Sequence, residues 1–263
     1  MKLTTTSLIT ITLLCFGAAP LSRAADDSFA GKWKFNPEKS QLGGLTYKVE
    51  DAGNNKITFK FGDTSETVSL DGKPHTTRFG STWEVTKNGA NAFKWLRKRD
   101  GKTLSDATWT VANDGATSTY DTTETRPDGS TSHDVITLKR TGGGTSGLVG
   151  TWESTEIKIG SPGTMEVEKS GTNGYSMKNR AYREDTDFKV DGKSYTPKGP
   201  NVAPGTTVSA KEMGDNKMKL TYKLKGKVSE TDTWELSSDG KTLTETVTYP
   251  GEKKQEVDIF ERD

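Results

Sequence analysis

Histidine and cysteine, the side chains that most often bind metals or act as nucleophiles, are scarce in this chain. Its 263 residues include two histidines, His75 and His133, and one cysteine, Cys15. A zinc site needs about four nitrogen or sulfur donors, so we predict no metal site and expect each histidine to be exposed or hydrogen-bonded. Nucleophile-elbow, phosphate-loop and dinucleotide motifs are missing as well. We therefore assign no catalytic residue, metal ligand or cofactor from the sequence.

One acidic run, Glu184-Asp185-Thr186-Asp187, spaces two carboxylates as calcium loops do. Lys189 occupies the next alternate position, and the glycine and glutamate that an EF-hand requires are misplaced. We interpret the run as a solvated turn.

The most suggestive chemistry lies in residues 93–99, where alternation places four side chains on one face of a strand: Phe93, Trp95, Arg97 and Arg99. If that face is interior, Arg97 sets a cation among aromatic rings. The alternative is that Arg97 emerges near the strand end and extends over Trp95 toward solvent.

Strands must position these side chains, because apolar and polar residues alternate along most of the chain. Asp-Gly pairs separate the alternating runs, and such pairs favour tight hairpin turns. We therefore predict an all-β protein of two antiparallel up-and-down barrels or clams, about eight to ten strands each, with no helix of ordinary length.

A tandem repeat divides the chain into two units. Residues 83–119 align without gaps on residues 208–244, with 12 identities in 37 pairs, including Trp109 with Trp234. Tyr222 takes the place of Arg97, so we do not expect the two units to bind the same ligand. Between Asp191 and Val208 the second unit is five residues longer, within the proline-rich segment 197–205.

The predicted boundaries begin with a signal peptide at residues 1–24, which has a basic Lys2, an apolar stretch and small residues before the cleavage point. The first unit spans 25–140, a Gly/Ser/Thr linker 141–147 and the second unit 148–263. Cleavage would remove Cys15, so the mature chain would have no disulfide and no transmembrane segment. We expect a periplasmic or secreted protein.

Composition limits the classes of partner. Charged residues make up 28% of the chain, apolar residues 30%, and the mean hydropathy is −0.76. The formal charge is +1, and it becomes −1 when Lys2 and Arg23 are removed with the signal peptide. A charge so near zero argues against nucleic acid as a partner.

Both units begin with Gly-x-Trp and end with an arginine: Gly31-Lys32-Trp33 with Arg140, and Gly150-Thr151-Trp152 with Arg262. First and last strands pair in a closed barrel, so we expect each arginine to lie across the tryptophan of its own unit. Such stacking contributes about 0.5–2 kcal/mol.

This pattern resembles the calycins, the lipocalins and fatty-acid-binding proteins, and the chain is similar to secreted bacterial proteins with one or two lipocalin-like domains. The resemblance implies a barrel fold and a lipophilic ligand, with an interior arginine such as Arg97 holding a ligand carboxylate. The chain departs from lipocalins in its short units and in lacking their other motifs and C-terminal helix.

Three functions follow as hypotheses. The first is binding of a small lipophilic molecule inside a barrel. The second is a structural or interaction domain of the cell envelope with filled barrels, and the third is an isomerase or hydratase on a lipocalin-like scaffold. A protein partner is not identified by the sequence. The candidate ligand-binding residues, each of which could equally be core, are Trp83, Phe93, Trp95, Arg97, Trp109, Met218, Leu220, Tyr222 and Trp234.

Overall fold

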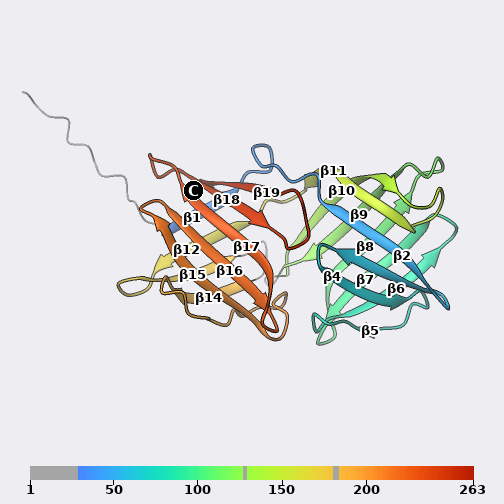
Figure 1. The fold of residues 1–263 in the computed structure, drawn as a ribbon, viewed down its shortest axis with the longest axis horizontal. Coiled ribbons are helices and arrows are strands. Elements are labelled where there is room, and N and C mark those ends of the chain that lie inside the picture. The colour runs from blue at the N-terminus through green and yellow to red at the C-terminus, as the bar shows by residue number, and fades with distance from the viewer. Residues whose placement is uncertain (1–28, 127–128, 180–183) are drawn as a thin grey trace, which may run out of the picture.

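A computed structural model describes residues 29–126, 129–179 and 184–263, which form two antiparallel β-sheets, each nearly closed into a barrel (Figure 1). The predicted all-β, up-and-down fold is confirmed, and the described residues contain no helix. The predicted signal peptide lies outside the described residues.

The ten-stranded barrel follows the order β4-β3-β2-β11-β10-β9-β8-β7-β6-β5. A bridge between Asp71 and Thr86 links its two edges. Its strands are β2 (Thr46–Gly53), β3 (Lys56–Phe61), β4 (Thr64–Ser69), β5 (His75–Thr76), β6 (Thr82–Asn88), β7 (Ala92–Arg99), β8 (Lys102–Val111), β9 (Thr117–Thr125), β10 (Thr131–Gly142) and β11 (Gly150–Ile159).

The nine-stranded barrel follows the order β14-β13-β12-β1-β19-β18-β17-β16-β15. The segment after β14 links its edges, because Lys198 bridges to Asp185 of β14 and Tyr195 bridges to Val208 of β15. Its strands are β1 (Gly31–Phe35), β12 (Thr164–Lys169), β13 (Gly174–Asn179), β14 (Glu184–Lys189), β15 (Thr206–Gly214), β16 (Lys217–Leu224), β17 (Lys227–Leu236), β18 (Thr242–Thr248) and β19 (Glu256–Arg262).

The two units exchange their first strands. β1 lies between β12 and β19 of the second unit, whereas β11 lies between β10 and β2 of the first unit. In Figure 1, β1 stands in the same barrel as the C-terminal strands. The predicted ranges 25–140 and 148–263 therefore do not correspond to separate sheets, because each lends one strand to the other barrel.

The glycine-rich segment 141–147, predicted as an interdomain linker, instead belongs to a hairpin between β10 and β11. Gly143, Gly144 and Gly147 have positive φ angles, which suit a turn. A strand that follows β10 so closely can pair with it at a small entropic cost of loop closure. β11 therefore occupies the place beside β10 that was predicted for β1, and β1 takes the equivalent place beside β19.

The predicted tryptophan–arginine contacts form, but between units. The Arg262 guanidinium lies 4.3 Å from the Trp33 ring, and the Arg140 guanidinium lies 4.0 Å from the Trp152 ring. Both tryptophans are fully buried. A Cβ on Gly31 or Gly150 would overlap these guanidinium groups, which explains the glycine in both Gly-x-Trp motifs. The prediction of Trp33 with Arg140 and Trp152 with Arg262 was wrong in its partners.

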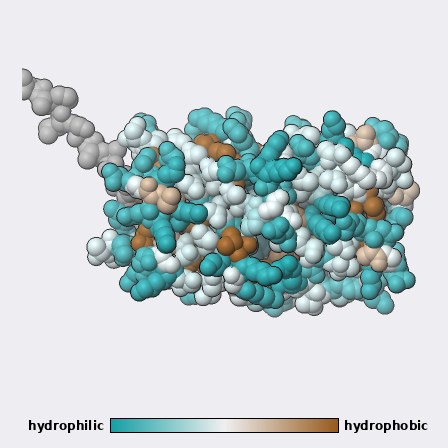
Figure 2. All heavy atoms as spheres, viewed as in Figure 1, coloured by the Kyte–Doolittle hydropathy of each residue, from teal (hydrophilic) through white to brown (hydrophobic). Residues whose placement is uncertain are grey.

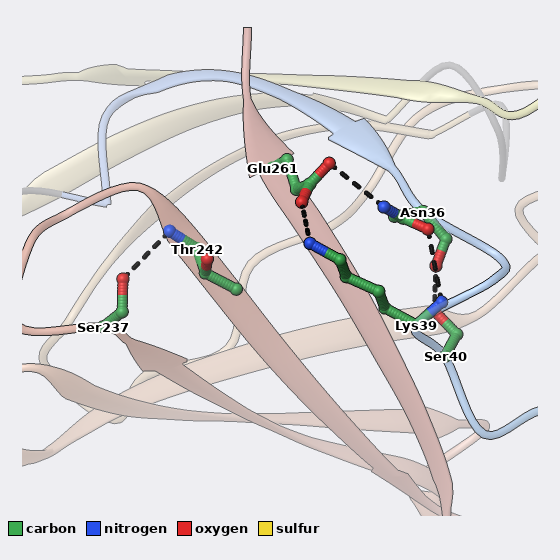
Figure 3. A network of polar contacts seen from close by, with 6 residues as sticks. All are labelled: Asn36, Lys39, Ser40, Ser237, Thr242 and Glu261. Atoms are coloured by element: carbon green, nitrogen blue, oxygen red, sulfur yellow. Dashed lines mark hydrogen bonds and ion pairs between the residues drawn. The ribbon is translucent and has the colours of Figure 1, made fainter.

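A crossing segment, residues 36–45, carries the chain from β1 to the ten-stranded barrel. Glu261 of β19 accepts hydrogen bonds from Asn36 Nδ2 at 3.0 Å and Lys39 Nζ at 2.5 Å (Figure 3). The backbone of Gln41 pairs with Val257, and Gly44 N donates to the Ser154 carbonyl of β11 at 2.7 Å. The segment thus bonds to both barrels, and residues 160–163 return the chain to β12.

Inward-facing residues of each barrel form its core, except where carboxylates replace apolar side chains. On β19 the apolar residues Val257 and Ile259 are only half-buried. Phe260 pairs with Phe35 and Leu243 and is buried, so alternation turns Asp258 and Glu256 to the same inner face.

Candidate functional site

A cavity of about 270 Å³ lies inside the ten-stranded barrel. The interior face of several strands contributes its walls, because successive strand residues point to opposite sides of the sheet. Its lining residues are mostly aromatic or aliphatic: Tyr47, Phe59, Trp83, Trp95, Arg97, Ser105, Trp109, Tyr120, Glu124, Ile136 and Leu138.

Edge-to-face ring contacts hold the aromatic wall together. Trp83 and Trp95 have ring centroids 5.1 Å apart, and Phe59 meets Trp95 at 6.0 Å and Trp109 at 6.1 Å. Each such pair contributes about 0.5–1.5 kcal/mol beyond the burial of its surface. The wall is therefore a fixed apolar surface.

Arg97 and Glu124 form the polar end of this cavity. Arg97 Nη2 lies 3.3 Å from Glu124 Oε2 and 3.5 Å from Asn201 Oδ1. Two buried donors that face this region, Trp83 Nε1 and Arg97 Nε, have no hydrogen-bond acceptor. Burial also raises the pKa of Tyr120 to about 12, so its phenol stays protonated at neutral pH.

A second cavity, of about 600 Å³, lies between the barrels. Residues of both barrels line it, and the Phe61 and Tyr249 rings meet across it with centroids 5.0 Å apart. It continues the first cavity, since the two share six lining residues: Tyr47, Phe59, Trp83, Arg97, Glu124 and Ile136.

The nine-stranded barrel contains a third cavity, of about 320 Å³, with a different lining. Tyr222 and Trp234 form part of its wall, together with four carboxylates, of which the sequence analysis considered only Glu184, as part of the acidic run: Glu184, Glu230, Asp232 and Glu245. Alternation was the available signal, because it puts Glu230 and Asp232 on the same face as Trp234. Arg97 reaches this cavity as well.

Burial raises the pKa of all four carboxyl groups. Repulsion from neighbouring members of this group adds to the effect at Glu230, Asp232 and Glu245. Burial likewise raises the pKa of Glu256 to about 8, with the Asp258 charge as the next cause. Tyr222 donates a hydrogen bond to Glu184 Oε1 at 3.1 Å. Burial thus shifts the carboxyl groups of the third cavity toward their protonated forms.

The structure places the predicted ligand-binding residues in two groups. Six line cavities: Trp83, Trp95, Arg97 and Trp109 in the ten-stranded barrel, and Tyr222 and Trp234 in the nine-stranded barrel. The other three, Phe93, Met218 and Leu220, are buried in the hydrophobic cores and line none of the three cavities. Arg97 stands near the end of β7 with its charged group at the junction of all three cavities.

Neither histidine lines any of the three cavities. His75 Nε2 contacts Asp71 Oδ1 and His133 Nε2 contacts Asp121 Oδ1, each at 2.8 Å. In the described part of the chain, no three His, Cys, Asp or Glu side chains gather closely enough to hold a metal ion. The acidic run is not a turn, because Glu184 opens strand β14 and faces the third cavity.

The proline-rich segment 197–205 bridges the barrels beside these cavities. Arg99 of β7 donates hydrogen bonds to the backbone carbonyls of Phe79, Pro200 and Val202. Asn201 and Val202 in turn form part of the wall of the third cavity. The five additional residues of the second unit thus close one side of its cavity.

No family model, curated protein or solved structure matches the chain. Within the described ranges, no helix has the length and apolarity needed to cross a lipid bilayer.

Proposed function

We propose that the chain is an exported binding protein whose ten-stranded barrel holds a small lipophilic molecule with a hydrogen-bond-accepting group. The observation that carries the proposal is the aromatic cavity with two buried donors, Trp83 Nε1 and Arg97 Nε, that have no acceptor. A buried donor without an acceptor costs about 1–3 kcal/mol. A ligand carbonyl or carboxylate near both donors would remove this cost while its apolar body packs on the rings.

Two features favour binding inside the barrel over the alternatives. A structural domain would be expected to have filled barrels, whereas this interior contains connected cavities. The face seen in Figure 2 is mainly hydrophilic, and the large apolar side chains most exposed among the described residues are Val149, Met213 and Val228. An isomerase or hydratase is less well supported, because neither histidine lines these cavities.

The export part of the proposal rests on residues 1–24. Periplasmic or secreted protein beginning at Ala25 in an intact-mass measurement would support it, whereas retention of residues 1–24 on the soluble protein would oppose it.

The binding part is tested with 1-anilinonaphthalene-8-sulfonate, which combines apolar rings with an anionic acceptor. Energy transfer from tryptophan to the dye reports binding, and native mass spectrometry of the protein reports any ligand carried from the cell. Trp83→Phe keeps the ring but deletes the donor, so we expect about fivefold to tenfold weaker dye binding. Arg97→Ala should weaken it at least as much.

Lys94→Ala is the matched control, because Lys94 lies on β7, the strand of Arg97, but on its outer face. Lys94 pairs there with Asp106 at 3.4 Å. Dye affinity within twofold of wild type is expected for this variant. The proposal would be refuted if native mass spectrometry gave the mass of the protein alone and the dye did not bind. It would also be refuted if dye affinity fell equally in all three variants.

A further inference from the structure

The carboxylates of the nine-stranded barrel converge on its cavity from three strands. Glu184 comes from β14, Glu230 and Asp232 from β17, and Glu245 from β18. Asp232 and Glu245 are the most buried, with 4% and 6% of their surface exposed. Burying a carboxylate is costly unless a cation or hydrogen-bond donors compensate it.

Compensation is incomplete within the described residues. Glu245 Oε1 accepts a hydrogen bond from Trp234 Nε1 at 2.7 Å, but Glu245 Oε2 and Asp232 Oδ1 are buried without a partner. Arg97 is the described cation on the cavity wall, and its guanidinium contacts Glu124 and Asn201 instead. Two acceptor oxygens are therefore available to a donor inside the cavity.

The wall fits an organic cation better than a metal ion. Among the described residues no three acidic, His or Cys side chains form a group that could hold a metal ion. An ammonium group has three N–H donors on a carbon body and can bond to separated oxygens. The rings of Tyr222 and Trp234 also line the cavity, and aromatic faces attract cations.

We propose that the nine-stranded barrel binds a small organic cation, with an ammonium group between Asp232 and Glu245 and an apolar body against Trp234 and Tyr222. This site shares only Arg97 with the lipophilic site of the ten-stranded barrel, and the proposal does not depend on that site. The protein would then carry two ligands of different chemistry in its two barrels.

Binding should release protons. Burial raises the pKa of both Asp232 and Glu245 and so favours their protonated forms, whereas a bound ammonium favours the ionised forms. Affinity should therefore increase from pH 6 to pH 8. The other titratable or charged groups facing this region are Glu184, Glu230, Glu256, Asp258, Tyr222, Tyr249 and Arg97.

The experiment is calorimetric titration of the full protein with n-butylammonium chloride, with butan-1-ol as the neutral analogue of the same length. We expect n-butylammonium to bind at least tenfold more tightly than butan-1-ol at pH 8. Measurements in two buffers with different ionisation heats should show release of about one proton, because cation binding opposes protonation.

Asp232→Asn and Glu245→Gln each remove one charge with little change in shape, and each should weaken n-butylammonium binding about tenfold. Glu235→Gln is the matched control, since Glu235 lies on β17, the strand of Asp232, but pairs with Lys217 at the surface, 2.8 Å away. Its affinity should stay within twofold of wild type. Arg180 and Arg183, which lie outside the described residues, remain unchanged in every variant.

Three results would overturn the proposal: no binding of n-butylammonium, equal binding of butan-1-ol, or equal affinity in the two charge-removing variants and wild type. Binding of calcium ions without n-butylammonium would also overturn it in favour of a metal site. If a variant fails to fold, the comparison of the two ligands and the pH dependence in wild type still decide.

Discussion

Replacing Trp33 with alanine tests the strand exchange directly. Trp33 is fully buried, its Nε1 donates to the Phe29 carbonyl at 2.9 Å, and Arg262 stacks on its ring. Removing a buried tryptophan side chain costs about 3–5 kcal/mol, and this is a large share of the 5–15 kcal/mol that stabilises a typical domain. Because β1 pairs with β12 and β19, the loss should fall on the nine-stranded barrel.

Hydrogen exchange measured by mass spectrometry locates the effect. Trp33→Ala should speed exchange in β12 and β19 far more than in β10, although β10 belongs to the same repeat unit as β1. Trp152→Ala, the equivalent change at another fully buried tryptophan, should act on β10 and β2 instead.

A double-mutant cycle gives a second test of the same contacts. Trp33 and Arg262 should show a coupling energy of about 0.5–2 kcal/mol, as expected for a stacked cation and ring. Trp33 and Arg140 should show a coupling near zero. Coupling of Trp33 to Arg140, with faster exchange in β10 than in β19, would refute the exchanged arrangement.

Two further predictions concern the buried acids and the bridging segment. Burial raises the pKa of Glu256 to about 8, above the roughly 4.3 of an unfolded glutamate. The folded state therefore keeps this proton at a higher pH than the unfolded state does. The stability that comes from the protonated Glu256 is lost as pH rises through about 8. Urea unfolding should show stability falling between about pH 5 and 8, by up to about 4 kcal/mol from this group at about 1.4 kcal/mol per pH unit. The profile should be flatter for Glu256→Gln, and a rise in stability over that range would contradict the assignment. Arg99→Ala should make trypsin cleavage after Lys198 at least tenfold faster, because each charge-assisted hydrogen bond from Arg99 to segment 197–205 contributes about 1.5–3 kcal/mol. Lys98 pairs with Glu84 instead, so the Lys98→Ala variant should be cleaved at the wild-type rate.

The strand content and the two-barrel organisation were predictable because they depend on local patterns. Alternation and Asp-Gly turns determine which residues form strands, and the repeat implies that both units fold alike. The partner of each first strand was not predictable from these patterns. The same Gly-x-Trp motif contains Trp33 and Trp152, and the same guanidinium group is present at Arg140 and Arg262. Motif matching therefore cannot tell which arginine stacks on which tryptophan.

The candidate sites were predictable to different degrees. Trp83, Trp95, Arg97 and Trp109 were found because aromatic residues at strand spacing indicate an interior face. The acidic lining was missed because charged residues are ordinarily assigned to the solvent face, yet Asp232 and Glu245 are buried in the nine-stranded barrel. The one signal in the sequence was alternation along β17, which puts Glu230 and Asp232 on the same face as Trp234.

The exchanged first strands have a consequence for how the chain folds during synthesis. β1 is made before β10 and long before β19, so Arg140, the partner in the unexchanged arrangement, is made long before Arg262. Only when β11 has been made and has folded back on β10 is that position filled. The native topology therefore requires β1 to wait for a partner more than 200 residues away, at Arg262, and the unexchanged closure competes with it as a kinetic trap.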